Sequence, residues 1–492
     1  MREEIGLKII CAVVFSGLII WMAYSQYYSE SRQKNAEPWR LDQSRYRPYL
    51  SIGLPVLFIV IGVLELLING VQSMVSLLVS MCFDIFFLIC GYYVILLVLL
   101  PVLRRYISSR ACAMLWMIPN GLYYLFVVQW RSFRFQKPRW VICAPEKVVW
   151  TVFCIWGAGF AFVLIWKIIS HIIFRRSILR EAKIISDPEI LSIFEQEAEN
   201  ANYENPKFKL VYSDRVRTPL SIGLFNSTMR IVLPYKSFSE EELKLIFRHE
   251  LIHIGHEDAW TKFFMVFCTA ICWFNPLMWI AMRKSADDIE LSCDETVLID
   301  CNDASRKQYA DIILKTAGDE RGFTTCLSAS ANAMRYRLKS IMRPSKRWNG
   351  VFFVGIACFS LIMSYGYTAL AYEEHTGSEV IFFNHDTKLF TSEEVFMGNG
   401  EDDTEYDSVD VSALNEYLAN QIMLDIRGDF SLGDEKYIQW TCEGPDGSYW
   451  IQLEDSYVKI LTIETETIED RVYYLPNKVD WEYIDSILQG DS

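Results

Sequence analysis

Two histidines four residues apart, His249 and His253, are the residues of this chain whose spacing most clearly implies chemistry. On a helix, residues i and i+4 lie one turn apart on one face, so both imidazoles can reach one metal ion, with Glu250 beside it. This is the H-E-x-x-H signature of zinc hydrolases. Ser239 and Glu242 form an S-x-x-E capping box before the motif, which predicts that the pair lies within a helix. We therefore expect His249 and His253 to bind zinc.

A catalytic zinc ion needs a third protein ligand and leaves a fourth position for water. The best candidates lie in 287–294, where Glu290 and Asp294 again have i, i+4 spacing. Glu290 is the expected third ligand, and Asp294 is expected to accept the second N–H of a ligand histidine and fix its tautomer. An H-E-x-x-H pattern alone often arises by chance. The second acidic element favours a metal site, as does the presence of three of the six histidines between His249 and His256.

The composition is typical of a membrane protein, since 52% of the 492 residues are hydrophobic and only 22% are charged. Six apolar blocks approach or exceed the roughly 20 residues needed to cross about 30 Å of hydrocarbon. They are 5–25, 49–68, 74–103, 111–128, 148–172 and 350–371. A further apolar stretch, 263–282, is expected to be buried, interfacial or re-entrant, because a crossing there would separate Glu290 from the two histidines.

Basic residues in short loops predict the orientation of these spans. Three basic clusters, around Arg40, Arg104 and Arg175, face the cytoplasm if the N-terminus is outside; the loop 131–147 disagrees. The zinc motif then lies in the cytoplasm and the residues after Ala371 lie outside. That last part is acidic, with 29 Asp and Glu against 6 Lys and Arg after residue 372, which argues against nucleic-acid binding. It contains one of the 13 cysteines, so no internal disulfide is expected.

We therefore predict a multi-pass cell-membrane protein in four parts. Residues 1–172 form an N-terminal membrane region with about five spans, 173–349 a cytoplasmic zinc metallopeptidase domain, 350–371 the last transmembrane helix, and 372–492 an acidic extracytoplasmic sensor-like domain. The fold class is a multi-span α-helical membrane protein with a cytoplasmic α/β peptidase domain and a small extracytoplasmic α+β domain.

Alternating and β-branched stretches predict the strands of both domains. In the peptidase domain they are 207–213 and a hairpin of 220–225 with 229–233; in the outer domain they are 379–383, 437–441 with 449–453, and a hairpin within 459–475. Helices are predicted at 411–422 and 481–488. A strand edge beside the zinc helix would bind an extended peptide by strand addition, which implies a protein substrate. The i, i+4 pair Cys268 and Cys272 lies in an apolar helix and is expected to belong to the core.

Several short motifs together resemble the BlaR/MecR group of membrane zinc metallopeptidases. They are Thr218-Pro219-Leu220-Ser221-Ile222-Gly223-Leu224, Ile231-Val232-Leu233-Pro234, His249-Glu250-Leu251-Ile252-His253 with Asp258 five residues on, Trp273-Phe274-Asn275-Pro276-Leu277, and Glu290-Leu291-Ser292-Cys293-Asp294. The resemblance implies a gluzincin-like fold, zinc ligands His249, His253 and Glu290, Glu250 as general base, and Asp258 and Asp294 as supporting residues. It also implies an antirepressor that senses an extracellular ligand or protein and cleaves a cytoplasmic winged-helix repressor, after self-cleavage within a segment matching 322–346.

The chain departs from that group in three places. Gly255-His256-Glu257 stands where basic residues are usual, and two N-terminal spans exceed the usual four. The only match to a penicillin-binding Ser-x-x-Lys nucleophile, Ser456 to Lys459, lies in a predicted strand with 33 residues after it, so β-lactam sensing is not implied. No outer-domain residues suggest catalysis, and its role is either sensing or a stabilising cap.

Two other functions stay open. One is a membrane quality-control protease of the HtpX or CaaX-processing kind, which shares the H-E-x-x-H motif. The other is a non-catalytic receptor with a structural zinc site. For the peptidase, His256 and Tyr309 are candidates by residue type for stabilising the oxyanion.

Overall fold

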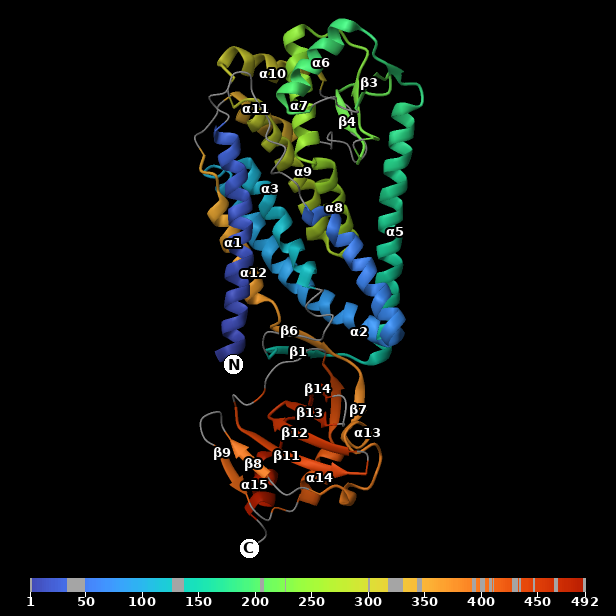
Figure 1. Cartoon of the computed structure of the whole chain (residues 1–492), viewed down its shortest axis with the longest axis vertical. Coiled ribbons are helices and arrows are strands. Elements are labelled where there is room, and N and C mark those ends of the chain that lie inside the picture. The colour runs from blue at the N-terminus through green and yellow to red at the C-terminus, as the bar shows by residue number, and fades with distance from the viewer. Residues whose placement is uncertain are drawn as a thin grey trace.

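The computed structural model shows an elongated molecule with the predicted peptidase elements at one end and the C-terminal domain at the other (Figure 1). It describes residues 2–32, 49–125, 137–203, 208–225, 227–299, 301–316, 331–342, 347–391, 395–398, 403–406, 409, 411–426, 432, 435–445, 447–463 and 468–489. Of the predicted self-cleavage segment, therefore, only 331–342 is described.

Apolar helices form the middle of the molecule, which we call the apolar bundle. They are α1 (Arg2–Arg32), α2 (Tyr49–Leu103), α3 (Ser109–Met117), the 3-10 helix η2 (Ile118–Leu125), α5 (Glu146–Leu179) and α12 (Val351–Ser364). The two predicted spans 49–68 and 74–103 are the two arms of α2, which turns sharply at Gly70, a residue with φ 85° that only glycine adopts easily (Figure 1). The predicted span 111–128 is divided between α3 and η2, which begins at Ile118, and its last three residues lie outside the described ones.

Two described helices are long and apolar enough to cross a membrane, namely Gly53–Leu103, which contains the Gly70 turn, and Glu146–Leu179. Two shorter apolar helices are Lys8–Trp21 and Val351–Ser364. The predicted last span 350–371 is wrong at its end, because α12 stops at Ser364 and strand β6 (Thr368–Ala371) follows.

The apolar stretch 263–282 is a helical hairpin that enters the bundle and returns. Its arms are α8 (Asp258–Ile271) and α9 (Pro276–Val297). At the tip, Trp273 donates a hydrogen bond to the carbonyl of Trp156 in α5, and Asn275 contacts Cys90 Sγ in α2 at 3.3 Å. Gly159 of α5 leaves room for the Trp273 indole, which lies 2.2 Å from the place of a Cβ there. The tip is therefore held between α2 and α5.

The outer face of α9 is tied to the bundle by two ion pairs, of which the first is the more deeply buried. Asp288, with no exposed surface, accepts hydrogen bonds from Arg104 at the end of α2 (2.7 Å) and from the Trp116 indole (2.8 Å). Two turns on, Glu295 pairs with Arg347 and with Ser109 at the start of α3. These contacts fix α9 on the side opposite the metal-site residues described below.

Breaking the first pair should strongly destabilise the protein. In Asp288→Ala, Arg104 loses its buried carboxylate, which typically costs about 3–5 kcal/mol. The neighbouring Asp287 makes only a partly exposed 3.6 Å pair with Lys284, so Asp287→Ala should cost less than about 1 kcal/mol. Thermal unfolding of the two variants in detergent checks the difference; equal melting temperatures would show that the Arg104 pair adds nothing.

The peptidase end contains a four-stranded sheet covered by helices. Its strands, in spatial order, are β2 (Lys183–Ile184), β3 (Lys209–Tyr212), β5 (Arg230–Leu233) and β4 (Leu220–Ile222). The helices are α6 (Pro188–Asn200), α7 (Glu240–Gly255), α10 (Asp303–Thr316) and α11 (Ala331–Met342). The predicted hairpin is confirmed, since β4 and β5 pair antiparallel, and β4 is the edge strand nearest α7.

The C-terminal domain is built on an eight-stranded sheet with helices against one face. The spatial order is β7 (Glu374–Thr376), β10 (Ile422–Asp425), β14 (Ile468–Tyr474), β13 (Tyr457–Ile463), β12 (Gly447–Glu454), β11 (Tyr437–Gly444), β8 (Val395–Gly398) and β9 (Asp403–Tyr406). The helices are α13 (Gly377–Val380), η3 (Thr387–Leu389), α14 (Val411–Ala419) and α15 (Trp481–Gln489). Both predicted hairpins are confirmed, and Lys459 lies in β13 as expected. The predicted strand 379–383 is wrong, because a Thr376–Glu379 capping box starts a helix there.

A short parallel sheet joins this domain to the bundle. Strand β1 (Trp140–Cys143), just before α5, pairs with β6. Beside it, Lys137 contacts Glu454 at 2.6 Å and Glu435 at 3.0 Å, and Arg139 lies over the Tyr367 ring. The acidic domain thus neutralises part of the basic loop 131–147, whose charge disagreed with the predicted orientation.

Candidate metal centre

The helix that carries the H-E-x-x-H motif begins and ends at defined signals. The predicted capping box is present, with Ser239 and Glu242 bonded reciprocally at the start of α7. After Gly255 the chain turns at Glu257, which adopts a left-handed conformation (φ 51°), and α8 starts at once with Asp258. The turn brings Asp258 back to the face of α7 that carries His253.

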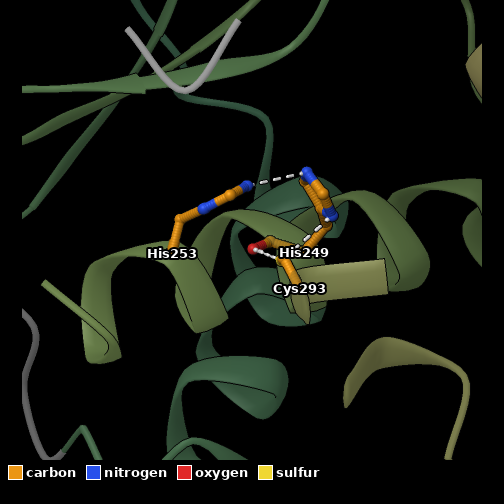
Figure 2. Close-up of side chains that lie close together, drawn as sticks. All are labelled: His249, His253 and Cys293. Carbon is orange, nitrogen blue, oxygen red and sulfur yellow. Dashed lines mark hydrogen bonds between the residues drawn. The ribbon is translucent and has the colours of Figure 1, made fainter. Parts of the chain in front are cut away.

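Three side-chain atoms face one point between α7 and α9. The Nε2 atoms of His249 and His253 are 3.1 Å apart, and Glu290 Oε2 lies 3.8 Å from the first and 3.5 Å from the second (Figure 2 shows the two rings). Ligands held tetrahedrally at about 2.0–2.1 Å from a metal are about 3.3 Å from one another. The three atoms therefore have the separations that a zinc-like ion requires.

The second nitrogen of each histidine has its own partner. His253 Nδ1 lies 2.6 Å from an oxygen of Asp258, and His249 Nδ1 lies 2.8 Å from the hydroxyl of Tyr309, which donates to Asp294 at 2.6 Å. If both Nδ1 atoms donate to these oxygens, both Nε2 lone pairs point at each other, an arrangement that a cation between them stabilises. Asp294 itself is 3.8 Å from His249, so the direct hydrogen bond expected there is replaced by a bridge through Tyr309.

Cys293 lies beside the same histidines and is not among the predicted site residues. It follows Glu290 by three residues on α9, and its thiol is 3.2 Å from His249 Nδ1 (Figure 2). His249, His253 and Cys293 have donor atoms within 4.8 Å of one another and form a possible metal site. However, the contact involves the nitrogen of His249 that faces away from His253, so Glu290 fits better as third ligand of an ion between the two Nε2 atoms.

Glu250 is almost fully buried, with 3% of its surface exposed. Burial raises its pKa above the ordinary value, and hydrogen bonds from the hydroxyl and backbone N–H of Ser221 oppose that shift. Its Oε2 atom is buried without a hydrogen-bond partner among the residues that the structure describes. A carboxylate oxygen in this position is suited to accept a proton from a substrate water.

Two basic side chains, the buried Lys262 and the partly exposed Arg337, hold the acidic half of the site. Lys262 Nζ is 3.2 Å from Glu290 Oε1, and Arg337 of α11 makes a two-pronged contact to Asp294 at 2.5 and 2.7 Å and lies 3.5 Å from Glu290 Oε2. Although burial alone raises it, the charges of His253 and Lys262 hold the pKa of Glu290 well below its ordinary value. No short-range pattern in the sequence predicts that Lys262 or Arg337 belongs to the site.

The formal charges of the site suit a divalent cation. Four carboxylates and two basic side chains gather here: Glu250, Asp258, Glu290, Asp294, Lys262 and Arg337. With neutral histidines, two negative charges are left over, and a buried net charge is costly.

The structure also places the two oxyanion candidates. Tyr309 contacts His249 and Asp294, and His256 is the C-cap residue of α7.

The family model for the BlaR1 peptidase M56 domain matches residues 134–341, which include every residue of this site. The regulatory protein BlaR1 of Bacillus licheniformis is 26% identical over 185 residues, 38% of this chain and 30% of that protein. The methicillin resistance mecR1 protein of Staphylococcus aureus is 33% identical over 108 residues, 21% of this chain and 18% of that protein.

Over this domain the chain is of the BlaR/MecR type. It therefore carries an M56 metallopeptidase domain, to which the site of His249, His253 and Glu290 belongs. The match spans less than a third of the length of these relatives, and the resemblance seen in the motifs is confirmed for the peptidase domain.

Proposed function

We propose that this BlaR/MecR-type protein is a membrane-bound zinc endopeptidase that acts as a signal-transducing antirepressor. The observation that carries the proposal is the convergence of His249 Nε2, His253 Nε2 and Glu290 Oε2 beside the buried Glu250. The two histidines and Glu290 would hold the ion, and the open side would admit water and substrate.

The chain's own residues then carry the proton transfers. When bound, zinc supplies a Lewis acid that polarises the scissile carbonyl and acidifies water. Glu250 takes the proton of the attacking water and returns a proton to the leaving amine, and its raised pKa suits both steps. Asp258 keeps His253 in one tautomer and orientation, and Tyr309 with Asp294 does the same for His249.

The substrate in this proposal is an extended segment of a protein. Strand β4 is an edge of the sheet, and its Ser221 contacts Glu250, so a peptide paired with this edge would pass the general base. The Bacillus relative is named a regulatory protein, and we infer a regulatory role for this chain as well. We infer a winged-helix repressor in the cytoplasm, no direct nucleic-acid binding by the chain, and a bilayer around the apolar bundle.

The C-terminal domain is the sensing part in this proposal. The domain contacts the loop before α5 through the Lys137–Glu454 pair and the β1–β6 strand pair. These contacts would connect a ligand bound to the domain with α5, a helix that reaches the peptidase sheet. At the other end of α5, the Ile178 carbonyl accepts a hydrogen bond from Ser213 next to β3. The sensed molecule is a ligand or protein outside the cell.

Metal removal tests the activity. The full chain in detergent is incubated with a candidate winged-helix repressor, and the intact masses of both proteins are followed before and after dialysis against a chelator. Cleavage should stop on dialysis, which removes the ion that the two histidines and Glu290 hold, and return with added Zn²⁺. Cleavage that persists without metal would contradict the proposal.

One observation favours a second candidate, the receptor with a structural metal site. The Cys293 thiol beside His249 and His253 offers a sulfur ligand of the kind that structural zinc sites use. Such a protein would bind zinc and cut neither itself nor the repressor, under any signal.

A further inference from the structure

Lys262 is the basic residue of α8, a mostly apolar helical arm. It lies one turn after Asp258 on α8, among Phe263, Phe264 and Met265, and only 4% of its surface is exposed. Lysines are almost never buried to this extent unless they are paired. The pairing here is with Glu290 Oε1, at 3.2 Å.

Each of the two charged residues of α8, Asp258 and Lys262, holds a candidate metal ligand. Asp258 and Lys262 are i and i+4, so they lie on one face of the helix. Asp258 holds Nδ1 of His253 at 2.6 Å, which leaves Nε2 facing His249. Lys262 holds Oε1 of Glu290, which leaves Oε2 facing the two histidines. One helical face therefore orients two of the three candidate metal ligands.

We propose that Lys262 is a positioning residue of the metal centre, whose ammonium holds one oxygen of Glu290 so that the other binds the ion. This inference rests on the proposed role of Glu290 as a ligand. It adds a group that neither the spacing of the motifs nor the family match identifies.

Two effects of Lys262 on metal affinity have opposite signs. Its positive charge repels a bound cation, so removing the charge alone would tighten metal binding. Its hydrogen bond fixes the ligand carboxylate, and the loss of such an outer contact typically lowers metal affinity about 10–100-fold. We expect the second effect to dominate. The four carboxylates and Arg337 remain at the site after Lys262 is replaced, so the loss of one positive charge changes the attraction for the cation only in part.

The test measures Zn²⁺ affinity of the full chain in detergent by competition with a chromophoric chelator. Lys262→Met, which keeps an unbranched apolar chain one atom shorter and without the charge or donors, should bind Zn²⁺ about 10–100-fold more weakly than wild type. Lys262→Arg keeps a donor and a charge and should recover part of the loss. The matched control is Lys284→Met, a partly exposed lysine on α9, which should bind Zn²⁺ like wild type.

A cleavage assay provides the second measurement. Excess Zn²⁺ should restore cleavage by Lys262→Met, since a positioning residue limits occupancy and leaves Glu250 intact. Three results would each overturn the inference while wild-type activity stands. They are Zn²⁺ binding by Lys262→Met as tight as that of wild type, equal Zn²⁺ affinities of the Met and Arg variants, and cleavage that excess Zn²⁺ does not restore. If wild type binds no Zn²⁺, the proposed function fails together with it.

Discussion

Replacement of Glu250 by glutamine should leave the zinc content of the protein unchanged and lower its cleavage rate by about 10²–10⁴-fold. Glutamine has the shape of glutamate and can keep the contact with Ser221, but it cannot take a proton from water. The carboxylate is not one of the three atoms that face the ion, so the metal should stay. The measurements are zinc per chain by elemental analysis and repressor cleavage by intact mass.

Glu242, in the same helix, supplies the matched control. It belongs to the capping box and contacts Lys315 at 3.2 Å, outside the metal centre. Glu242→Gln should therefore cut at nearly the wild-type rate. A Glu250→Gln protein that still cleaves at that rate would show that another group is the base, whereas one that loses its zinc would place Glu250 among the ligands.

The largest effect on metal binding should come from Glu290→Ala. It removes a ligand, so its Zn²⁺ affinity should fall by more than the roughly 100-fold that loss of an outer contact can cause, and cleavage should cease. Cys293→Ser replaces a neighbouring group of similar size on the same turn of α9. The wild-type thiol contacts His249 Nδ1, the nitrogen that faces away from the ion, so Cys293→Ser should keep Zn²⁺ and activity.

The opposite pair of results would reassign the site. Zinc retained by Glu290→Ala and lost from Cys293→Ser would mean that His249, His253 and Cys293 hold the ion, as in the structural-site alternative. Zinc affinity by chelator competition separates the two ligand sets without any assay of activity.

Local spacing predicted the parts of the site that lie within one helix. His249 with His253 and Glu290 with Asp294 are i, i+4 pairs, and the structure brings both pairs together. Cys293 could also have been found from its i+3 position after Glu290. Arg337 could not have been found in this way. It lies 43 positions after Asp294 on another helix, and no short-range pattern encodes their contact.

The fold shows the same division between local and distant signals. The Ser239 capping box correctly predicts the start of α7. The Thr376–Glu379 box is a similar local signal, and it starts a helix where a strand was predicted at 379–383. The end of the predicted span 350–371 was wrong for another reason. Residues 368–371 are apolar enough for a membrane helix, yet they form a strand because β1, over 220 residues earlier, pairs with them.

The α8–α9 hairpin has its tip at Trp273, between α2 and α5, and its base at Asp258, Lys262 and Glu290. Suppose that a shift of these helices changes the affinity for the ion by some factor. Linkage then requires that binding of the ion changes the equilibrium between the two helix positions by the same factor. The ion would then be an effector of the receptor as well as a reagent, and a cell poor in zinc would hold a population of receptors with a different response to the signal.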